Sequence, residues 1–203
     1  MRYVIRGYLG LMLLLLLSAC DIPSMSSVLA TAGQENITRQ DVVYRIGIAK
    51  GYGNREPMNE LALIYEINDA LTRQVAAKLG VVVSKKDVDK LNDILEKPNK
   101  DTKILNAVKW VFGDDHTGYR RVFLAPRVLN RKLLDWYEQH VAKQPLSPAD
   151  VKQAIAQSAA GQGKTPFDIW LRQQAQQLQV HIKDKTLKAG IQKKYPHTWW
   201  LNT

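Results

Sequence analysis

The only cysteine of this 203-residue chain, Cys20, directly follows an apolar run and directly precedes Asp21. A thiol is a good nucleophile, and a single one can be alkylated at one defined position. Without a second cysteine the chain can form neither an internal disulfide nor a thiolate metal cluster. The chemistry that Cys20 indicates is therefore covalent modification.

The residues before Cys20 have the order of a secretory signal. Arg2 and Arg6 precede an apolar stretch, and small residues end it. A helix over residues 9–19 would be about 16 Å long, roughly half of a hydrocarbon core. Asp21 and Pro23 prevent its extension, so we predict that residues 1–19 are a signal and not a permanent membrane span.

The end of this signal, Leu17-Ser18-Ala19-Cys20, resembles the lipobox of bacterial lipoproteins. The resemblance implies lipidation of Cys20 with cleavage before it, and two or three acyl chains give stable anchoring. The alternative is an ordinary signal followed by a chance cysteine. Asp21 resembles the signal that retains Gram-negative lipoproteins in the inner membrane. For a Gram-negative source, the implied location is the inner membrane, facing the periplasm.

Asp114, Asp115 and His116 form the densest polar cluster and have side chains that bind metals. A loop of aspartate and glycine between two helices is more often a cap and a turn. His140 and His181 have no partners nearby in the sequence, and no motif for a serine hydrolase, a zinc protease or a phosphate-binding loop is present. We therefore expect no enzyme activity, no cofactor and no metal.

The chain is basic, with a net charge of +10 that falls to +8 when residues 1–19, with Arg2 and Arg6, are removed. An exported lipoprotein rarely meets nucleic acid, so we expect no nucleic-acid partner. Positive charge suits a domain held beside anionic lipid headgroups. The tether after the anchor, residues 21–27, spans about 23 Å at most.

The apolar spacing predicts helices almost throughout, with one short strand at residues 28–32 and a turn at 33–36. Thr38 and Ser84 are expected to cap helices, and Gly80 to end the helix that follows Pro57. Pro126 should kink or restart the long segment 119–141. Further helices are expected at residues 101–112, 148–160 and 166–180.

Two motifs are more specific than these helices. Ile37-Thr38-Arg39-Gln40-Asp41 opens the first helix, and a later helix ends in Ala76-Ala77-Lys78-Leu79-Gly80-Val81-Val82-Val83-Ser84, followed by Asp87-Val88-Asp89. With the strand before them, they resemble the N-terminal chaperone domain of the SurA, PrsA and PpiD foldases. The resemblance covers roughly residues 28–141. It implies a mainly all-α, SurA N-terminal-like domain with one short N-terminal strand.

Members of that family usually continue into a parvulin prolyl isomerase domain, whereas this chain has only 62 further residues, helical in pattern. The isomerase module is therefore expected to be absent. Residues 166–182 loosely resemble the helix that closes the chaperone core in SurA-type chains. The expected organisation is a signal at 1–19, a lipidated tether at 20–27, the SurA N-like domain at 28–141 and a C-terminal helical extension at 142–203. We expect residues 166–182 to pack on residues 57–79.

The resemblance implies a chaperone or holdase that binds unfolded or nascent envelope proteins. Such a protein needs apolar surface, and aromatic side chains accept varied clients. The candidates for peptide contact are Tyr65, Trp110, Phe123, Trp136 and Trp170, each of which can instead be a core residue. A cleft beside the 166–182 junction is the expected site. The alternative is a scaffold subunit of a secretion or polysaccharide-export machine, with one dedicated envelope partner.

Overall fold

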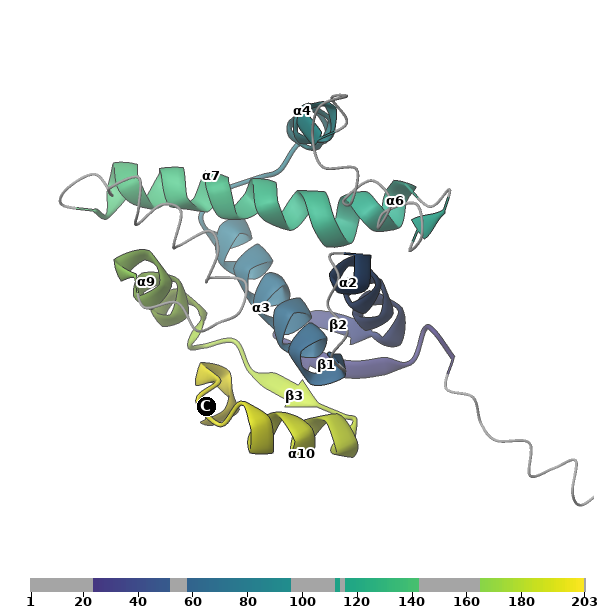
Figure 1. The fold of residues 1–203 in the computed structure, drawn as a ribbon. Coiled ribbons are helices and arrows are strands. Elements are labelled where there is room, and N and C mark those ends of the chain that lie inside the picture. The colour runs from purple at the N-terminus through teal and green to yellow at the C-terminus, as the bar shows by residue number, and fades with distance from the viewer. Residues whose placement is uncertain (1–23, 52–57, 96–111, 114–115, 143–164, 203) are drawn as a thin grey trace, which may run out of the picture.

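The computed structural model describes residues 24–51, 58–95, 112–113, 116–142 and 165–202. Most of these residues are helical, and three short strands form one small sheet (Figure 1). This confirms a mainly helical fold. The expected helices at 148–160 and over most of 101–112 lie outside the described residues.

The sheet has the order β2-β1-β3, and both pairings are antiparallel. β1 (Val28–Ala32) is the predicted strand, and it lies between β2 (Glu35–Thr38) and β3 (Val180–Ile182). The prediction of a single strand is therefore wrong. A lone strand would leave the backbone groups on both of its sides unpaired, and here both sides of β1 are paired.

A two-residue turn joins β1 to β2 and is held by a helix. Gly33 has a φ of 55°, in the left-handed region that favours glycine. The backbone N–H of Gln34 donates to Oε1 of Gln74 at 3.0 Å, and Nε2 of Gln74 donates to the carbonyl of Ala32 at 2.7 Å. The amide of Gln74 thus ties the hairpin to the helix that carries it.

That helix, α3 (Asn59–Lys78), is the centre of the molecule (Figure 1). It contacts α2 (Arg39–Gly51), β1, β2 and the later helices α7, α9 and α10. Its apolar side chains face neighbours on several sides; those with 1% exposure or less are Ala62, Leu63, Ile64, Ile67, Ala70, Leu71, Val75 and Ala76. Because α3 is buried on several sides, it determines the relative positions of the helices and strands that pack against it.

The predicted helix ends are confirmed. Gly80 has a φ of 71° at the end of α3, and the N–H of Val81 donates to the carbonyl of Ala76 at 2.9 Å. Thr38 forms a capping box with Asp41 at the start of α2. Ser84 does the same with Asp87 at the start of α4 (Lys85–Leu95).

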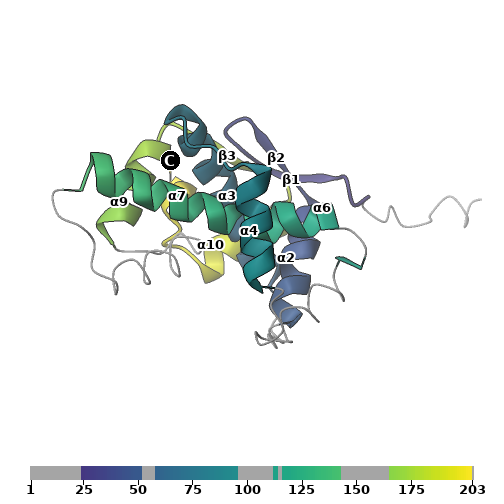
Figure 2. The ribbon, with the colours of Figure 1, turned by 90° about the horizontal axis from the view of Figure 1, so that it is seen from above.

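The segment with Pro126 begins anew just before that proline, as expected. α6 (His116–Tyr119) leads into the π-helix η1 (Arg120–Leu124), and α7 (Ala125–His140) follows with Pro126 in its first turn. Proline lacks the N–H that an interior helical position would use, so a change of helical pitch directly before it is physically reasonable. α7 then crosses α3 (Figures 1 and 2).

The C-terminal part returns to the N-terminal part, which confirms the packing of residues 166–182 on 57–79. α9 (Pro166–Ala175) contacts α3, and so does α10 (Lys185–Lys194). The expected helix at 166–180 is too long, because α9 ends at Ala175 and β3 begins five residues later. Leu178, Val180 and Ile182 are apolar at every second residue, which is the period of a strand.

Two apolar clusters fill the interior. The larger surrounds α3 and contains residues from β1 through to the short 3-10 helix η2 (Trp199–Asn202), whose Trp200 is 3% exposed. The smaller joins the end of α2 to α4 and η1, with Phe123 at 2% exposure. Val83, in the connection between α3 and α4, packs against both clusters. The two clusters therefore meet beside this connection.

Candidate functional site

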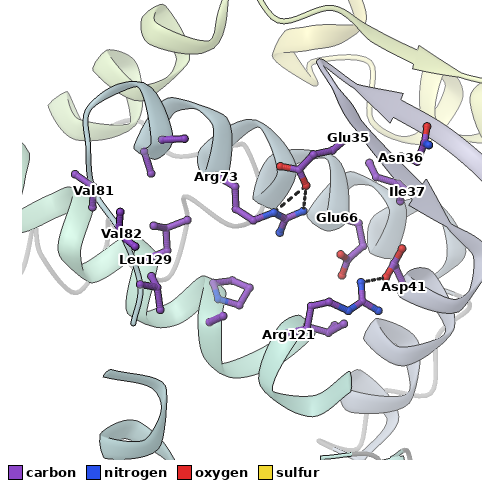
Figure 3. A pocket seen from close by; sticks show the side chains of 16 residues that line it. Glu35, Asn36, Ile37, Asp41, Glu66, Arg73, Val81, Val82, Arg121 and Leu129 are labelled. Atoms are coloured by element: carbon purple, nitrogen blue, oxygen red, sulfur yellow. Dashed lines mark hydrogen bonds and ion pairs between the residues drawn. The ribbon is translucent and has the colours of Figure 1, made fainter. Parts of the chain in front are cut away.

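A cavity of about 470 Å³ opens where the two clusters meet (Figure 3). It lies between β2, the C-terminal half of α3, the α3–α4 connection and the η1–α7 segment. Its lining residues are Glu35, Asn36, Ile37, Asp41, Glu66, Arg73, Ala76, Ala77, Val81, Val82, Val83, Arg121, Val122, Ala125, Pro126 and Leu129. We call this cavity the β2 pocket.

One side of the β2 pocket is aliphatic. Val81, Val82 and Val83 line it in extended conformation because Gly80 ends α3 before them and Ser84 caps α4 after them. Val82 is 70% exposed, a large apolar surface for one side chain. Lys132 of α7 holds the connection in place, since its Nζ lies 2.9 Å from the carbonyl of Val82.

β2 meets the pocket along its edge. Three consecutive residues of the strand, Glu35, Asn36 and Ile37, contribute to the lining. Glu35 and Ile37 lie on the side of the strand that faces α3, where Glu35 binds Arg73 and Ile37 is 2% exposed, whereas Asn36 points away from the cavity (Figure 3). Within the described chain, the outer side of β2 has no strand paired to it. The pocket therefore lies at an open sheet edge.

Ion pairs line the opposite side of the pocket (Figure 3). Arg73 binds Glu35, with its Nη2 2.6 Å and its Nε 2.9 Å from the same carboxylate oxygen, and Arg121 binds Asp41. Burial alone would raise the pKa of Asp41. Hydrogen bonds from Thr38 and the Arg121 guanidinium outweigh that effect and hold the pKa below its usual value. The charges at the mouth are thus already paired.

A buried charge network lies behind these pairs. Arg45 of α2 binds two carboxylates of α3, with Nε 2.7 Å from Glu66 and Nη2 in contact with Asp69. Burial raises the pKa of Glu66 to about 7; the guanidinium of Arg45 opposes the rise and the charge of Asp69 adds to it. Glu66 also lines the pocket. Its charge is therefore sensitive to pH near neutrality.

This arrangement can bind an extended apolar segment. The valines and Leu129 offer contact area for an aliphatic side chain, and the edge of β2 offers backbone groups for pairing. The lining contains no cysteine, serine, histidine or lysine. The β2 pocket can therefore bind a ligand through apolar contacts and main-chain hydrogen bonds, next to charged side chains that are already paired.

Four of the five aromatic residues chosen from the sequence are described by the structure; these four do not form one site, and none of them lines the β2 pocket. Tyr65 is half-buried on α3, with the guanidinium of Arg45 5.8 Å from its ring centroid. Phe123 is 2% exposed and belongs to the smaller core cluster. Trp110 lies outside the described residues.

Trp136 and Trp170 do come together, at the far end of α7. Their half-buried rings lie 5.7 Å apart, and the ring of His140 stacks on Trp136 at 4.4 Å. No residue of α9 lines the β2 pocket, so this pocket is not the cleft expected beside residues 166–182. Cys20, Asp21 and the loop pair Asp114 and Asp115 lie outside the described residues, as does the side chain of His116.

Sequence reasoning missed the β2 pocket because it sought aromatic side chains. The signal was present in Val81-Val82-Val83, which the sequence analysis considered only as part of the motif that ends a helix. Three consecutive valines in an extended connection cannot all turn inwards, because neighbouring side chains alternate in direction. At least one of them had to contribute apolar surface.

No protein-family model, curated protein sequence or solved structure matches this chain. Within the part of the chain that the structure describes, no helix is both long enough and apolar enough to cross a bilayer. The same residues contain no group of three or more histidine, cysteine or acidic side chains placed to hold a metal ion.

Proposed function

We propose that this chain is a lipid-anchored protein of the inner membrane that faces the periplasm and holds unfolded or nascent exported polypeptides without prolyl isomerase activity. The observation that carries the proposal is the β2 pocket, a cavity with one aliphatic side that lies at a strand with no partner on its outer side in the described chain. The lipobox-like Leu17-Ser18-Ala19-Cys20 supports the anchor. The resemblance of residues 28–141 to SurA-like chaperone domains supports the role.

In this proposal an extended client segment lies along the edge of β2 and places an aliphatic side chain against Val81, Val82 and Leu129. Main-chain pairing is independent of sequence, whereas one apolar side chain selects only for hydrophobicity. The binding is therefore broad and weak, as a holdase requires. The ion pairs at the mouth keep the apolar surface soluble without presenting unpaired charge to the client.

The test is suppression of aggregation of a denatured outer-membrane-type client by the purified protein, followed by light scattering. The double variant A77Q/V82Q makes the exposed apolar rim polar. Glutamine is chosen because the nearby ammonium of Lys132 would pair with an acidic replacement. We expect suppression to require about tenfold more protein, equivalent to roughly 1.4 kcal/mol of lost contact.

The matched control is V43Q/A189Q, which makes the same changes at exposed positions outside the pocket. It should suppress aggregation as well as the unchanged chain does. If both double variants behave alike, the pocket is not the client site. Absence of suppression by the unchanged protein, together with tight retention of one folded envelope protein, would favour the scaffold subunit instead.

A further inference from the structure

One exposed surface of the C-terminal part is strongly basic. Lys185, Lys188 and Lys193 lie on the solvent side of α10, and exposed Lys183 lies two residues before the helix begins. The opposite side of α10 faces α3, where Ile191 is fully buried and Lys194 binds Glu60 at 2.8 Å. We call the four exposed lysines the lysine face.

The lysine face has no ion-pair partner within the part of the chain that the structure describes. The one acidic residue of segment 180–202, Asp184, caps α10 by accepting from the N–H of Leu187 at 3.0 Å. Among the described residues, no ion pair involves any of the four lysines, in contrast to the pairs that line the β2 pocket. Four like charges on one side of a helix and at its start, with no ion-pair partner among the described residues, attract an anionic surface.

The lysine face lies where the chain arrives from the proposed anchor. The register of β1 and β3 pairs Ala30 with Ile182, and the N–H of Lys183 donates to the carbonyl of Leu29 at 2.8 Å. The nine residue steps from Cys20 to Leu29 reach at most about 32 Å. Met25, just before β1, is 45% exposed and adds an apolar group on the same approach.

The sheet separates this surface from the candidate client site. β3, with α10 beside it, forms one edge of the sheet, whose order is β2-β1-β3 (Figure 1). The β2 pocket is lined by residues of the strand at the other edge. A surface that contacts the lysine face therefore leaves the β2 pocket open on the far side of β1.

We propose that the lysine face docks on the anionic phospholipid headgroups of the membrane that carries the anchor, so that the β2 pocket faces away from the bilayer. Of the proposed function, this inference requires only the lipid anchor. Each lysine close to an anionic membrane strengthens binding about fivefold. This attraction is screened within about 8 Å at physiological salt, so the lysines must lie at the surface itself.

The experiment uses the full lipidated chain in bilayer discs. In the variant Q192C, a fluorophore is attached between the lysines of α10, and lipids with a quencher in the headgroup report its proximity. One set of discs contains phosphatidylglycerol mixed with phosphatidylcholine, and the other contains phosphatidylcholine alone. We expect strong quenching in the first set, weak quenching in the second, and loss of the difference in 1 M salt.

Charge reversal tests the lysines themselves. K185E/K188E/K193E on the Q192C background should lose the quenching in anionic discs, because removal of three lysines weakens the docking on the order of 100-fold. K78E/K86E/K90E changes the same net charge at exposed positions on α3 and α4 and should keep the quenching. Thermal unfolding of each variant confirms that its fold is retained.

Quenching that is equal in both kinds of disc, or that survives reversal of the lysine face, overturns the proposal. Loss of client binding in K185E/K188E/K193E without a change in quenching would assign the surface to an acidic polypeptide and also overturns it. Failure of the anchor gives a different result, because the unchanged chain would then leave the discs in 1 M salt. Quenching by anionic discs at low salt would still support docking of the lysine face on anionic headgroups.

Discussion

Glu66 and Asp69 are both buried on α3, and a single guanidinium, that of Arg45, serves both carboxylates. Burying a charge without a partner is costly, and one cation cannot fully compensate two anions. Uptake of a proton by Glu66 relieves the excess negative charge. At the scale of single residues, the protein therefore carries a group beside its pocket that responds to pH.

The first prediction from this network concerns stability. The pKa of Glu66 is raised to about 7 in the folded protein against 4.5 for an ordinary glutamate. Between these values the folded state holds a proton that the unfolded state has lost, so stability falls as pH rises from 4.5 to 7. We expect a loss of roughly 3 kcal/mol across this window. Urea unfolding at a series of pH values measures it.

E66Q should abolish the decrease in the free energy of unfolding between pH 4.5 and 7, because a glutamine has no proton to release. We call this pH dependence the slope. E138Q removes a carboxyl group from α7 and should leave the slope in place. A separate loss is expected below pH 3.8, where protonation of Asp41, whose pKa is lowered, breaks its contact with Arg121. An E66Q variant that keeps the full slope between pH 4.5 and 7 would exclude Glu66 as its source.

At the scale of elements, two glycines in the left-handed region have different surroundings. A Cβ added at Gly33 would lie 2.1 Å from Oε1 of Gln74, the side chain that holds the β1–β2 turn. A Cβ added at Gly80 would meet nothing within 4 Å. The hairpin turn is therefore constrained by both conformation and packing, whereas the end of α3 is constrained by conformation alone.

G80A should destabilise the protein by about 1 kcal/mol, the cost of a left-handed alanine. G33A should cost more, because Gln74 must move and give up its hydrogen bonds to the turn. In the background Q74A, the additional cost of G33A should fall to that of G80A. Free energies of unfolding for the four variants measure this, and equal costs for G33A and G80A in the unchanged protein would refute the role of Gln74.

At the scale of the whole molecule, the C-terminal part completes the core of the N-terminal part. Phe167 of α9 is 1% exposed and belongs to the same cluster as β1 and α3, while its neighbour Ile169 is 50% exposed. β3 covers one edge of β1, and Nε1 of Trp200 donates to Asn68 of α3 at 2.9 Å. Segments more than 130 residues apart are thus expected to unfold together.

F167A should lower the free energy of unfolding by 3–5 kcal/mol, within the range for loss of a buried phenylalanine. I169A should change it by no more than about 0.5 kcal/mol, because this side chain of the same helix points to solvent. In both variants the transitions followed by circular dichroism and by tryptophan fluorescence should coincide. Separate transitions would show that the N-terminal and C-terminal parts unfold independently.

The sequence by itself determined the local features of this fold. The caps at Thr38 and Ser84, the end of a helix at Gly80 and a kink or restart at Pro126 were predicted, because each depends on residues within a few positions of one another. The return of residues 166–182 to α3 was also predicted, since apolar stripes need partners. Local hydrogen bonding and helical period are properties that a linear pattern records.

The pairing of the three strands and the existence of the β2 pocket were evident only from the tertiary structure. β2 and β3 are short and gain their stability from pairing with β1, a contact that in the case of β3 spans about 150 residues of sequence. The sequence also did not determine which large apolar side chains are exposed. Phe123 is buried in the smaller cluster, whereas Val82, in the connection between α3 and α4, is exposed to solvent. The pocket is formed by three separate stretches of the chain, residues 35–41, 66–83 and 121–129, and exists only because long-range packing brings them together. The spacing of apolar residues within one stretch contains no information about the other two.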